Sequence, residues 1–178
     1  AMLLVGGVPL LSHYGRVDES SNYLVEDYTH NMFSSLQPEA LVLSYQWDYW
    51  VSAACYYQLV RQYRTDVAVI DKELLRRSWY YPQLAARSPW LIAGSSAEVE
   101  VFLAELAKFE YERPYDSAVI QARYVAMIRS FIARSLPVRP VYVTGEIEEE
   151  FTRGLQRVPE GLAFKVYEDT LFHTIHDT

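Results

Sequence analysis

The sequence has a single cysteine, Cys55, in 178 residues, and it lacks an apolar run long enough to span a bilayer. One cysteine excludes an internal disulfide and any zinc site built from cysteines. The apolar start, residues 1–11, is about half the length of the roughly 20-residue segment that a spanning helix needs. Positive charge is also scarce, since the net charge is −7 and Arg76-Arg77 is the only adjacent cationic pair. This charge balance argues against nucleic acid as a partner.

Glycine-rich phosphate motifs are missing as well. The first predicted strand runs into residues 44–48 (SYQWD), and no Gly-x-Gly-x-x-Gly or Gly-x-x-x-x-Gly-Lys-Ser/Thr occurs. Bulky side chains there would keep backbone N–H groups away from a phosphate, and no Gly-x-Ser-x-Gly nucleophile motif is present. His173 and His176 are spaced for a zinc ion, but the sequence places no third ligand. We therefore expect no cofactor and no metal.

Aromatic residues, in contrast, are abundant, with 15 tyrosines and 4 tryptophans. Such side chains combine an apolar body with a polar tip, which suits interfaces and packing against sugar faces. A tyrosine-rich core and rim is the simpler interpretation, and we favour it over a dedicated binding surface.

Short apolar runs alternate with amphipathic segments along the chain. The apolar runs predict strands near residues 40–45, 66–70, 140–144 and 162–167. Helical spacing predicts a helix that ends before Pro38 and further helices over residues 51–59, 78–87, 99–109, 120–131 and 148–156. The first two strands and the helix between them form a βαβ unit, which requires parallel pairing. The sequence thus predicts a mostly parallel, Rossmann-like three-layer α/β sandwich of four or five strands with helices on both faces.

Two segments follow from the composition. Residues 1–17 are interpreted as the end of a membrane helix and a linker, because they are apolar but too short to span by themselves. Residues 18–178 are predicted to form a single soluble α/β domain, since their length and average charge content (22% of the whole chain) suit one compact core.

Acidic and aromatic side chains gather where the predicted parallel strands end. Open α/β sheets bind ligands outside the carboxyl ends of their strands. Carboxylates accept hydrogen bonds from hydroxyl groups, and aromatic faces pack against the C–H faces of sugars, so the edge suits a glycan or a peptide. The predicted ligand-binding residues are Asp48, Asp71, Glu73, Trp47, Trp79 and Tyr80. We expect Asp48 and Asp71 to face one crevice, flanked by the two tryptophans.

A structural interpretation of the same residues competes with this one, and the residue types favour it. Asp48 is then the N-cap of a helix, while Asp71 and Glu73 pair with neighbouring cations at positions 72, 76 or 77. The aromatic side chains are then packing residues.

The stretch from Asp18 to Leu84 resembles the segment that follows the last membrane helices in multi-pass membrane proteins of the protein O-mannosyltransferase-like family. The resemblance rests on residues 23–28 and on residues 64–67 leading to Asp71, while RPVYVTGEI and GLAFKVY resemble the next strands. It implies a glycosyltransferase that uses a lipid-linked sugar and whose catalytic carboxylate lies in an amino-terminal membrane half. No catalytic residue is therefore carried over to this chain. Of the family's Gly-Asp-Asn-Asp-like run, only Asp48 has a match here.

The resemblance implies an extracytoplasmic (periplasmic) accessory domain that is not catalytic alone. Its partners would be the membrane-embedded amino-terminal half of the same protein and a glycan or acceptor protein. Two alternatives remain open. One is a self-sufficient soluble carbohydrate-active enzyme with Asp48 and Asp71 as its carboxylate pair. The other is a structural domain that dimerises the transferase through its aromatic surface.

Overall fold

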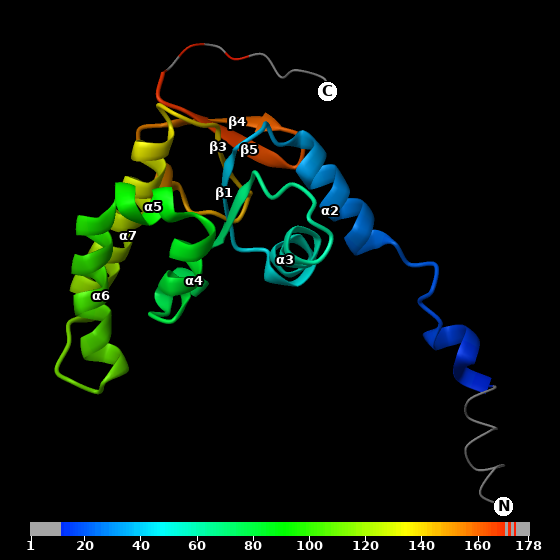
Figure 1. The fold of residues 1–178 in the computed structure, drawn as a ribbon, viewed down its shortest axis with the longest axis horizontal. Helices are drawn as coiled ribbons and strands as arrows, with labels where there is room; N and C mark the ends of the chain where they lie inside the picture. The colour runs from blue at the N-terminus through cyan, green and yellow to red at the C-terminus, as the bar shows by residue number, and fades with distance from the viewer. Residues whose placement is uncertain (1–11, 170, 172, 174–178) are drawn as a thin grey trace, which may run out of the picture.

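The computed structural model describes residues 12–169, 171 and 173. These residues form an open five-stranded sheet with the strand order β2-β1-β3-β5-β4 (Figure 1). The strands are β1 (Leu41–Ser44), β2 (Ala68–Asp71), β3 (Val141–Val143), β4 (Gln156–Glu160) and β5 (Ala163–Tyr167). The sheet confirms the α/β fold class, and four of its strands lie where the apolar runs predicted them.

The first half of the sheet is parallel. β1 pairs in parallel with β2 and with β3, and Leu41 lies opposite both Ala68 and Val141. The chain passes from β1 to β2 through η1 (Trp47–Val51), a π-helix, and α3 (Ser52–Leu59). The predicted βαβ unit is therefore confirmed, and the carboxyl ends of β1, β2 and β3 share one edge of the sheet.

The second half of the sheet corrects the prediction. β5 runs antiparallel to both β3 and β4, so the sheet is mixed and the expectation of a mostly parallel sheet is wrong for this half. The helix expected over residues 148–156 shrinks to the 3-10 helix η3 (Glu149–Thr152), because the chain turns at Gly154, whose φ is 86°. Residues 156–160 then form β4. A Rossmann-like arrangement is accordingly not confirmed.

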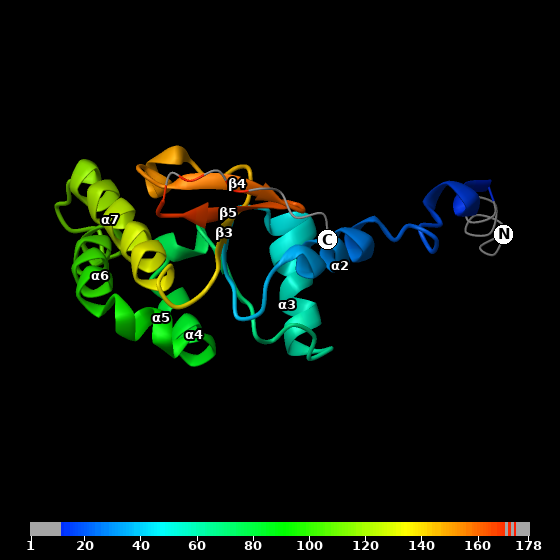
Figure 2. The ribbon, with the colours of Figure 1, turned by 90° about the horizontal axis from the view of Figure 1, so that it is seen from above.

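Helices cover both faces of the sheet, as predicted (Figure 2). One face carries α2 (Leu24–Ser35) and α3, and the other carries α4 (Tyr80–Arg87), α5 (Pro89–Gly94), α6 (Ser96–Glu110) and α7 (Ser117–Ser135). Side chains of β1 alternate between the two cores: Leu41 and Leu43 pack with the α4–α7 side, and Val42 packs with the α2–α3 side. This alternation follows from the two-residue period of a strand, and it buries β1 on both faces.

The ends and buried faces of the helices agree only in part with what the sequence predicts. Asp116 caps α7, because its carboxylate accepts hydrogen bonds from the backbone N–H groups of Ala118 (2.8 Å) and Val119 (3.4 Å). Helical spacing predicts Val51, Cys55 and Leu59 on the apolar face of this helix, but α3 buries Ala54 and Gln58 while Leu59 is exposed.

The β4–β5 hairpin docks against the end of α2 at Gly161. The φ of Gly161 is 61°, a left-handed conformation that favours glycine. A Cβ atom at this position would overlap the Cβ of Ser35 and lie 2.5 Å from its Oγ. The Ser35 hydroxyl donates to the carbonyl oxygen of Met32 at 2.8 Å, which fixes it against the helix. Only glycine fits this contact.

Among the described residues, no helix has both the length and the apolar character that crossing a bilayer requires. Residues 12–17 are helical and exposed. Most of the segment interpreted as the end of a membrane helix, residues 1–11, lies outside the described residues.

Candidate functional site

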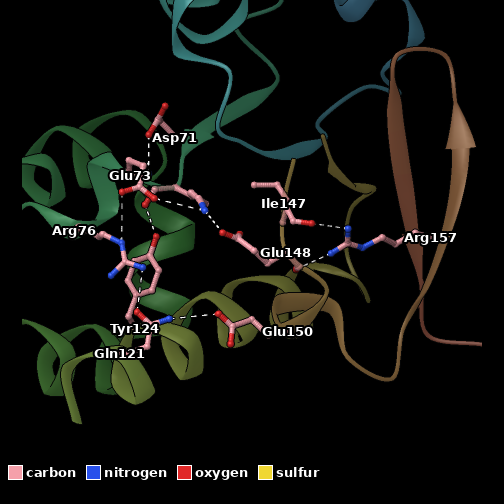
Figure 3. Close-up of polar contacts among 10 residues, drawn as sticks. Asp71, Glu73, Arg76, Gln121, Tyr124, Ile147, Glu148, Glu150 and Arg157 are labelled. Atoms are coloured by element: carbon pink, nitrogen blue, oxygen red, sulfur yellow. Dashed lines mark hydrogen bonds and ion pairs between the residues drawn. The ribbon is translucent and has the colours of Figure 1, made fainter. Parts of the chain in front are cut away.

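Polar side chains from distant parts of the chain meet at the carboxyl edge of the parallel strands (Figure 3). They come from the segment after β2, from α7, from the segment after β3 and from η3. We call this set the carboxyl-edge network; its members are Asp71, Lys72, Glu73, Arg76, Gln121, Tyr124, Glu148 and Glu150.

Lys72 is the centre of the network and is only 5% exposed. Its ammonium group contacts the carboxylate of Glu148, lies 3.5 Å from that of Glu73, and sits 4.7 Å from the ring centroid of Tyr45. Such partners are what a buried charge requires. Burial raises the pKa of Glu148, but the hydrogen bond from Lys72, a backbone hydrogen bond and the charges of Lys72 and Arg76 together lower it below its usual range. Lys72 thus joins the exits of all three parallel strands.

Tyr124 on α7 anchors the network to the helical layer. Its hydroxyl donates to the backbone carbonyl of Lys72, and the guanidinium of Arg76 lies 4.0 Å from its ring centroid. The ring also packs against Phe102 (5.5 Å) and Phe151 (6.0 Å). Burial raises the pKa of the Tyr124 hydroxyl, so it stays a neutral donor.

An outer row of polar contacts continues from Arg76. The guanidinium Nε lies 3.6 Å from Glu73, and its Nη2 donates to Gln121 at 3.0 Å. Gln121 in turn donates to Glu150 at 3.3 Å. Because Arg76 and Glu73 are half-exposed, this ion pair contributes little stability and mainly sets the positions of the side chains.

Arg157 on β4 fixes the segment that carries Glu148. Its guanidinium donates to the backbone carbonyls of Ile147 (2.7 Å) and Glu148 (2.8 Å) and to the hydroxyl of Thr152 (2.6 Å). The unpredicted strand β4 therefore helps to position the carboxylate that pairs with Lys72.

Asp71 points into the protein and is 2% exposed. Its Oδ1 accepts hydrogen bonds from the backbone N–H groups of Glu73 (2.7 Å) and Leu74 (2.9 Å), at the start of the 3-10 helix η2 (Leu74–Arg76). Burial raises the pKa of Asp71, although these two bonds act in the opposite direction. The pairing expected for Glu73 with Lys72 and Arg76 is confirmed, whereas Asp71 binds the backbone.

The other predicted site residues divide into exposed and buried groups. Asp48 is exposed, Trp47 is 48% exposed and Trp79 is 54% exposed. Tyr80 is buried, and burial raises its pKa to about 12. The expected N-cap role of Asp48 is wrong, because Gln46 is the N-cap of η1 and Asp48 lies within the first turn.

A second polar chain at the same edge was not predicted. The hydroxyl of Tyr28 on α2 donates to Gln46 Oε1 at 2.8 Å, and the amide of Gln46 donates to the carboxylate of Glu146. Glu146 follows β3, so Gln46 connects α2 to the exits of β1 and β3. No signal in the sequence marks a glutamine at this position, because its partners are 18 and 100 residues away.

The described residues hold no group of three or more His, Cys, Asp or Glu side chains placed to bind a metal ion. The ring of His173 stacks on Tyr167 with centroids 3.7 Å apart, and its Nε2 lies 2.6 Å from Asp169. His176 lies outside the described residues.

The fold and the site define a mixed, open α/β domain with a buried lysine network at the carboxyl edge of its parallel strands. No protein-family model matches the chain, and no solved structure matches it. Among curated proteins, the chain is similar to protein O-mannosyl-transferase TMEM260 of Mus musculus, with 27% identity over 78 residues. The match covers 44% of this chain and 11% of that protein. This partial similarity fits the resemblance and is compatible with a domain associated with a glycosyltransferase.

Replacing Asp71 tests whether its charge matters to the fold. Because burial raises its pKa, the native state binds the proton more tightly than the unfolded state, and stability falls as the pH rises from 3.8 through the raised value. Asp71→Asn keeps an acceptor oxygen without the charge, so at pH 7 its free energy of unfolding should stay within about 1 kcal/mol of the wild type. Asp71→Ala removes both backbone bonds and should cost about 1–2 kcal/mol.

Urea unfolding of the wild type and both variants at pH 3.5 and pH 7 measures these differences. The stability of Asp71→Asn relative to the wild type should rise with pH. A fall instead would show that the ionised carboxylate stabilises the folded state.

Proposed function

We propose that this chain is an accessory domain of a glycosyltransferase-like membrane protein, and that it holds a glycan or an acceptor protein segment at the carboxyl edge of its sheet. We place it on the extracytoplasmic face, next to the membrane-embedded half of the same protein. The partial similarity to an O-mannosyl-transferase supports the association with a glycosyltransferase. The observation that carries the binding role is the half exposure of Trp47 and Trp79, which lie in the segments that follow the adjacent strands β1 and β2.

Both tryptophans follow neighbouring strands of the sheet along the chain, which supports a shared edge. Trp47 begins η1 after β1, Trp79 precedes α4 after β2, and the two strands are adjacent and parallel. η1 also contacts β2, and the ring of Tyr45 lies against the buried Lys72. The ring of Trp79 packs on that of Tyr80, with centroids 6.1 Å apart, so a buried residue supports it. Each tryptophan is about half exposed, which leaves aromatic surface to pack on a sugar or a peptide.

The burial of Asp71 supports an accessory role over a glycoside hydrolase. A retaining or inverting hydrolase needs two carboxyl groups that flank the scissile glycosidic bond and can both reach it. Asp48 is exposed, whereas Asp71 is buried and its Oδ1 already accepts two backbone hydrogen bonds. Exposed Asp48 and half-exposed Glu73 are the carboxylates that can accept hydrogen bonds from a ligand.

The proposal predicts weak binding that depends on Trp79. Titrating methyl α-mannoside, and separately a capped Ser/Thr-rich peptide, into the ¹⁵N-labelled 178-residue chain should shift NMR signals around residues 47–49 and 79. Trp79→Ala should weaken this binding about two- to tenfold, because one aromatic contact is lost. Tyr111→Ala is the matched control, since Tyr111 is 70% exposed at the end of α6, and it should leave the affinity unchanged.

Three results would contradict the proposal. The first is that neither ligand shifts the signals around these residues. The second is that the Trp79→Ala and Tyr111→Ala variants bind equally well, and the third is that the chain alone transfers mannose from a lipid-linked donor. If Trp79→Ala instead converts a dimer to a monomer in analytical ultracentrifugation, the aromatic edge is a subunit interface.

A further inference from the structure

A pocket of about 260 Å³ runs along the free edge of β2. β2 is an edge strand, because the strand order places β1 on one side of it and no strand on the other within the described residues. Three consecutive strand-edge residues, 67 to 69, line the pocket together with residues from the ends of α3 and α4. Since successive side chains of a strand point to opposite faces, the pocket meets this segment along its backbone edge.

The backbone groups on this edge can be assigned from the strand pairing. Ala68 N–H donates to Ala40 O (2.8 Å) and Lys72 N–H donates to Ser44 O (2.9 Å), so the even-numbered residues of β2 face β1. The backbone groups of Val67, Val69 and Asp71 therefore face outward.

Side chains satisfy the two ends of this outward row. Gln58 Nε2 donates to Val67 O at 2.7 Å, and the hydroxyl of Tyr80 interacts with the backbone of Asp71, which lowers the otherwise raised pKa of Tyr80. Between them, the N–H and the C=O of Val69 have no hydrogen-bond partner among the described residues. Val67, Ala68 and Val69 are only 4%, 9% and 6% exposed, so this edge is largely covered, but its unpaired backbone lines the pocket and can pair there with an extended segment.

The lining of the pocket contains one cation and one carboxylate, and only the cation lacks an ion-pair partner among the described residues. Arg87 at the end of α4 donates to Gln58 Oε1 at 2.7 Å and lies 3.8 Å from Cys55 Sγ, and it forms no ion pair with a described carboxylate. Asp66, the acidic residue of the lining, already pairs with Arg64 at 3.0 Å. The guanidinium of Arg87 therefore retains donors for the carboxylate of a ligand. Hydrogen bonds between a guanidinium and a carboxylate are charge-assisted and stronger than those between neutral groups.

We propose that this pocket binds an extended peptide segment that carries an acidic side chain. The backbone of the segment pairs with the N–H and C=O of Val69, and its carboxylate binds Arg87. Leu84 and the exposed Leu59 line the walls for flanking apolar side chains. Because Gln58 and Tyr80 close the row at either end, only a short segment pairs. This site uses the strand edge of β2 and does not depend on the function proposed above.

The probe is the capped tripeptide Ac-Val-Glu-Val-NH2, titrated into the ¹⁵N-labelled 178-residue chain. The amide signal of Val69 should shift, together with that of its neighbour Ala68, and saturate. Arg87→Gln should weaken binding at least tenfold, because a charge-assisted hydrogen bond is lost. Arg77→Gln is the matched control: it removes the same charge from an exposed position outside the pocket lining and should bind as the wild type does.

Two altered peptides separate backbone pairing from charge. Ac-Val-Gln-Val-NH2 should bind about tenfold more weakly than the acidic peptide, and N-methylation of the glutamate nitrogen should abolish the Val69 shift because it removes the donor to Val69 O. Thermal unfolding confirms that both arginine variants are folded. The proposal is overturned if the Val69 signal does not move at millimolar peptide, if the shifts gather around Trp79 instead, or if Arg87→Gln and Arg77→Gln bind equally.

Discussion

Gly161→Ala should lower the free energy of unfolding by about 3 kcal/mol or more. Two effects add at this position. A non-glycine residue with φ near 61° costs about 1–2 kcal/mol of backbone strain. The new Cβ also overlaps Ser35, and forced overpacking of this kind costs about 1–3 kcal/mol. Because Ser35 Cβ lies next to the backbone of α2, it cannot rotate away, and the hairpin or the helix must shift.

Gly154→Ala is the matched control for Gly161→Ala. Gly154 also has a positive φ, 86°, but a Cβ there would meet no atom within 4 Å. It should therefore cost only the strain of about 1–2 kcal/mol. In the Gly161→Ala background, Ser35→Gly should restore at least about 1 kcal/mol of the lost free energy of unfolding. A double-mutant cycle of urea unfolding measurements gives this value. Equal losses for the two glycine variants would show that the hairpin does not press on α2.

Tyr124→Ala should destabilise the protein by about 3–5 kcal/mol, the range for removing a large buried aromatic side chain. The ring is fully buried between α6, α7 and η3 and supports Arg76. Tyr124→Phe keeps the ring but leaves the carbonyl of Lys72 without its donor, so it should cost about 1–2 kcal/mol.

Urea unfolding of both Tyr124 variants tests this division between ring and hydroxyl. Tyr111→Ala removes an exposed tyrosine and should change the free energy of unfolding by no more than about 0.5 kcal/mol. If Tyr124→Phe costs as much as Tyr124→Ala, the hydroxyl rather than the packing holds the network to α7.

Hydrophobic periodicity located β1, β2, β3 and β5 because each is a short apolar run between turn residues. Hydrophobic periodicity did not predict β4, for two reasons. Of its five residues only Val158 is buried, and Pro159 is unfavourable in a central strand. β4 is an edge strand, where proline is tolerated. Because β4 was not predicted, β5 was expected to run parallel to the other strands. The β4–β5 hairpin reverses the chain direction, so β5 enters the sheet antiparallel to β3.

The candidate site could be predicted only where its contacts are local. Glu73 pairs with Lys72 and Arg76, one and three residues away, as neighbouring charges suggested. Glu148 lies 76 residues from Lys72, and Tyr124 lies 52 residues away on a helix face predicted as core. These partners depend on how the segment after β3 and α7 meet the sheet, which spacing along the chain does not determine.

β5 is the last strand within the described residues, and yet it lies inside the sheet, between β3 and β4. During synthesis β1, β2 and β3 leave the ribosome first and can pair at once. β4 follows, but it cannot join the sheet until β5, which lies between β3 and β4, has also emerged. Until residue 167 is available, β3 therefore presents an open backbone edge to other nascent chains. A nascent chain that pauses before residue 167 would therefore hold an unfinished sheet that is prone to associate with its neighbours.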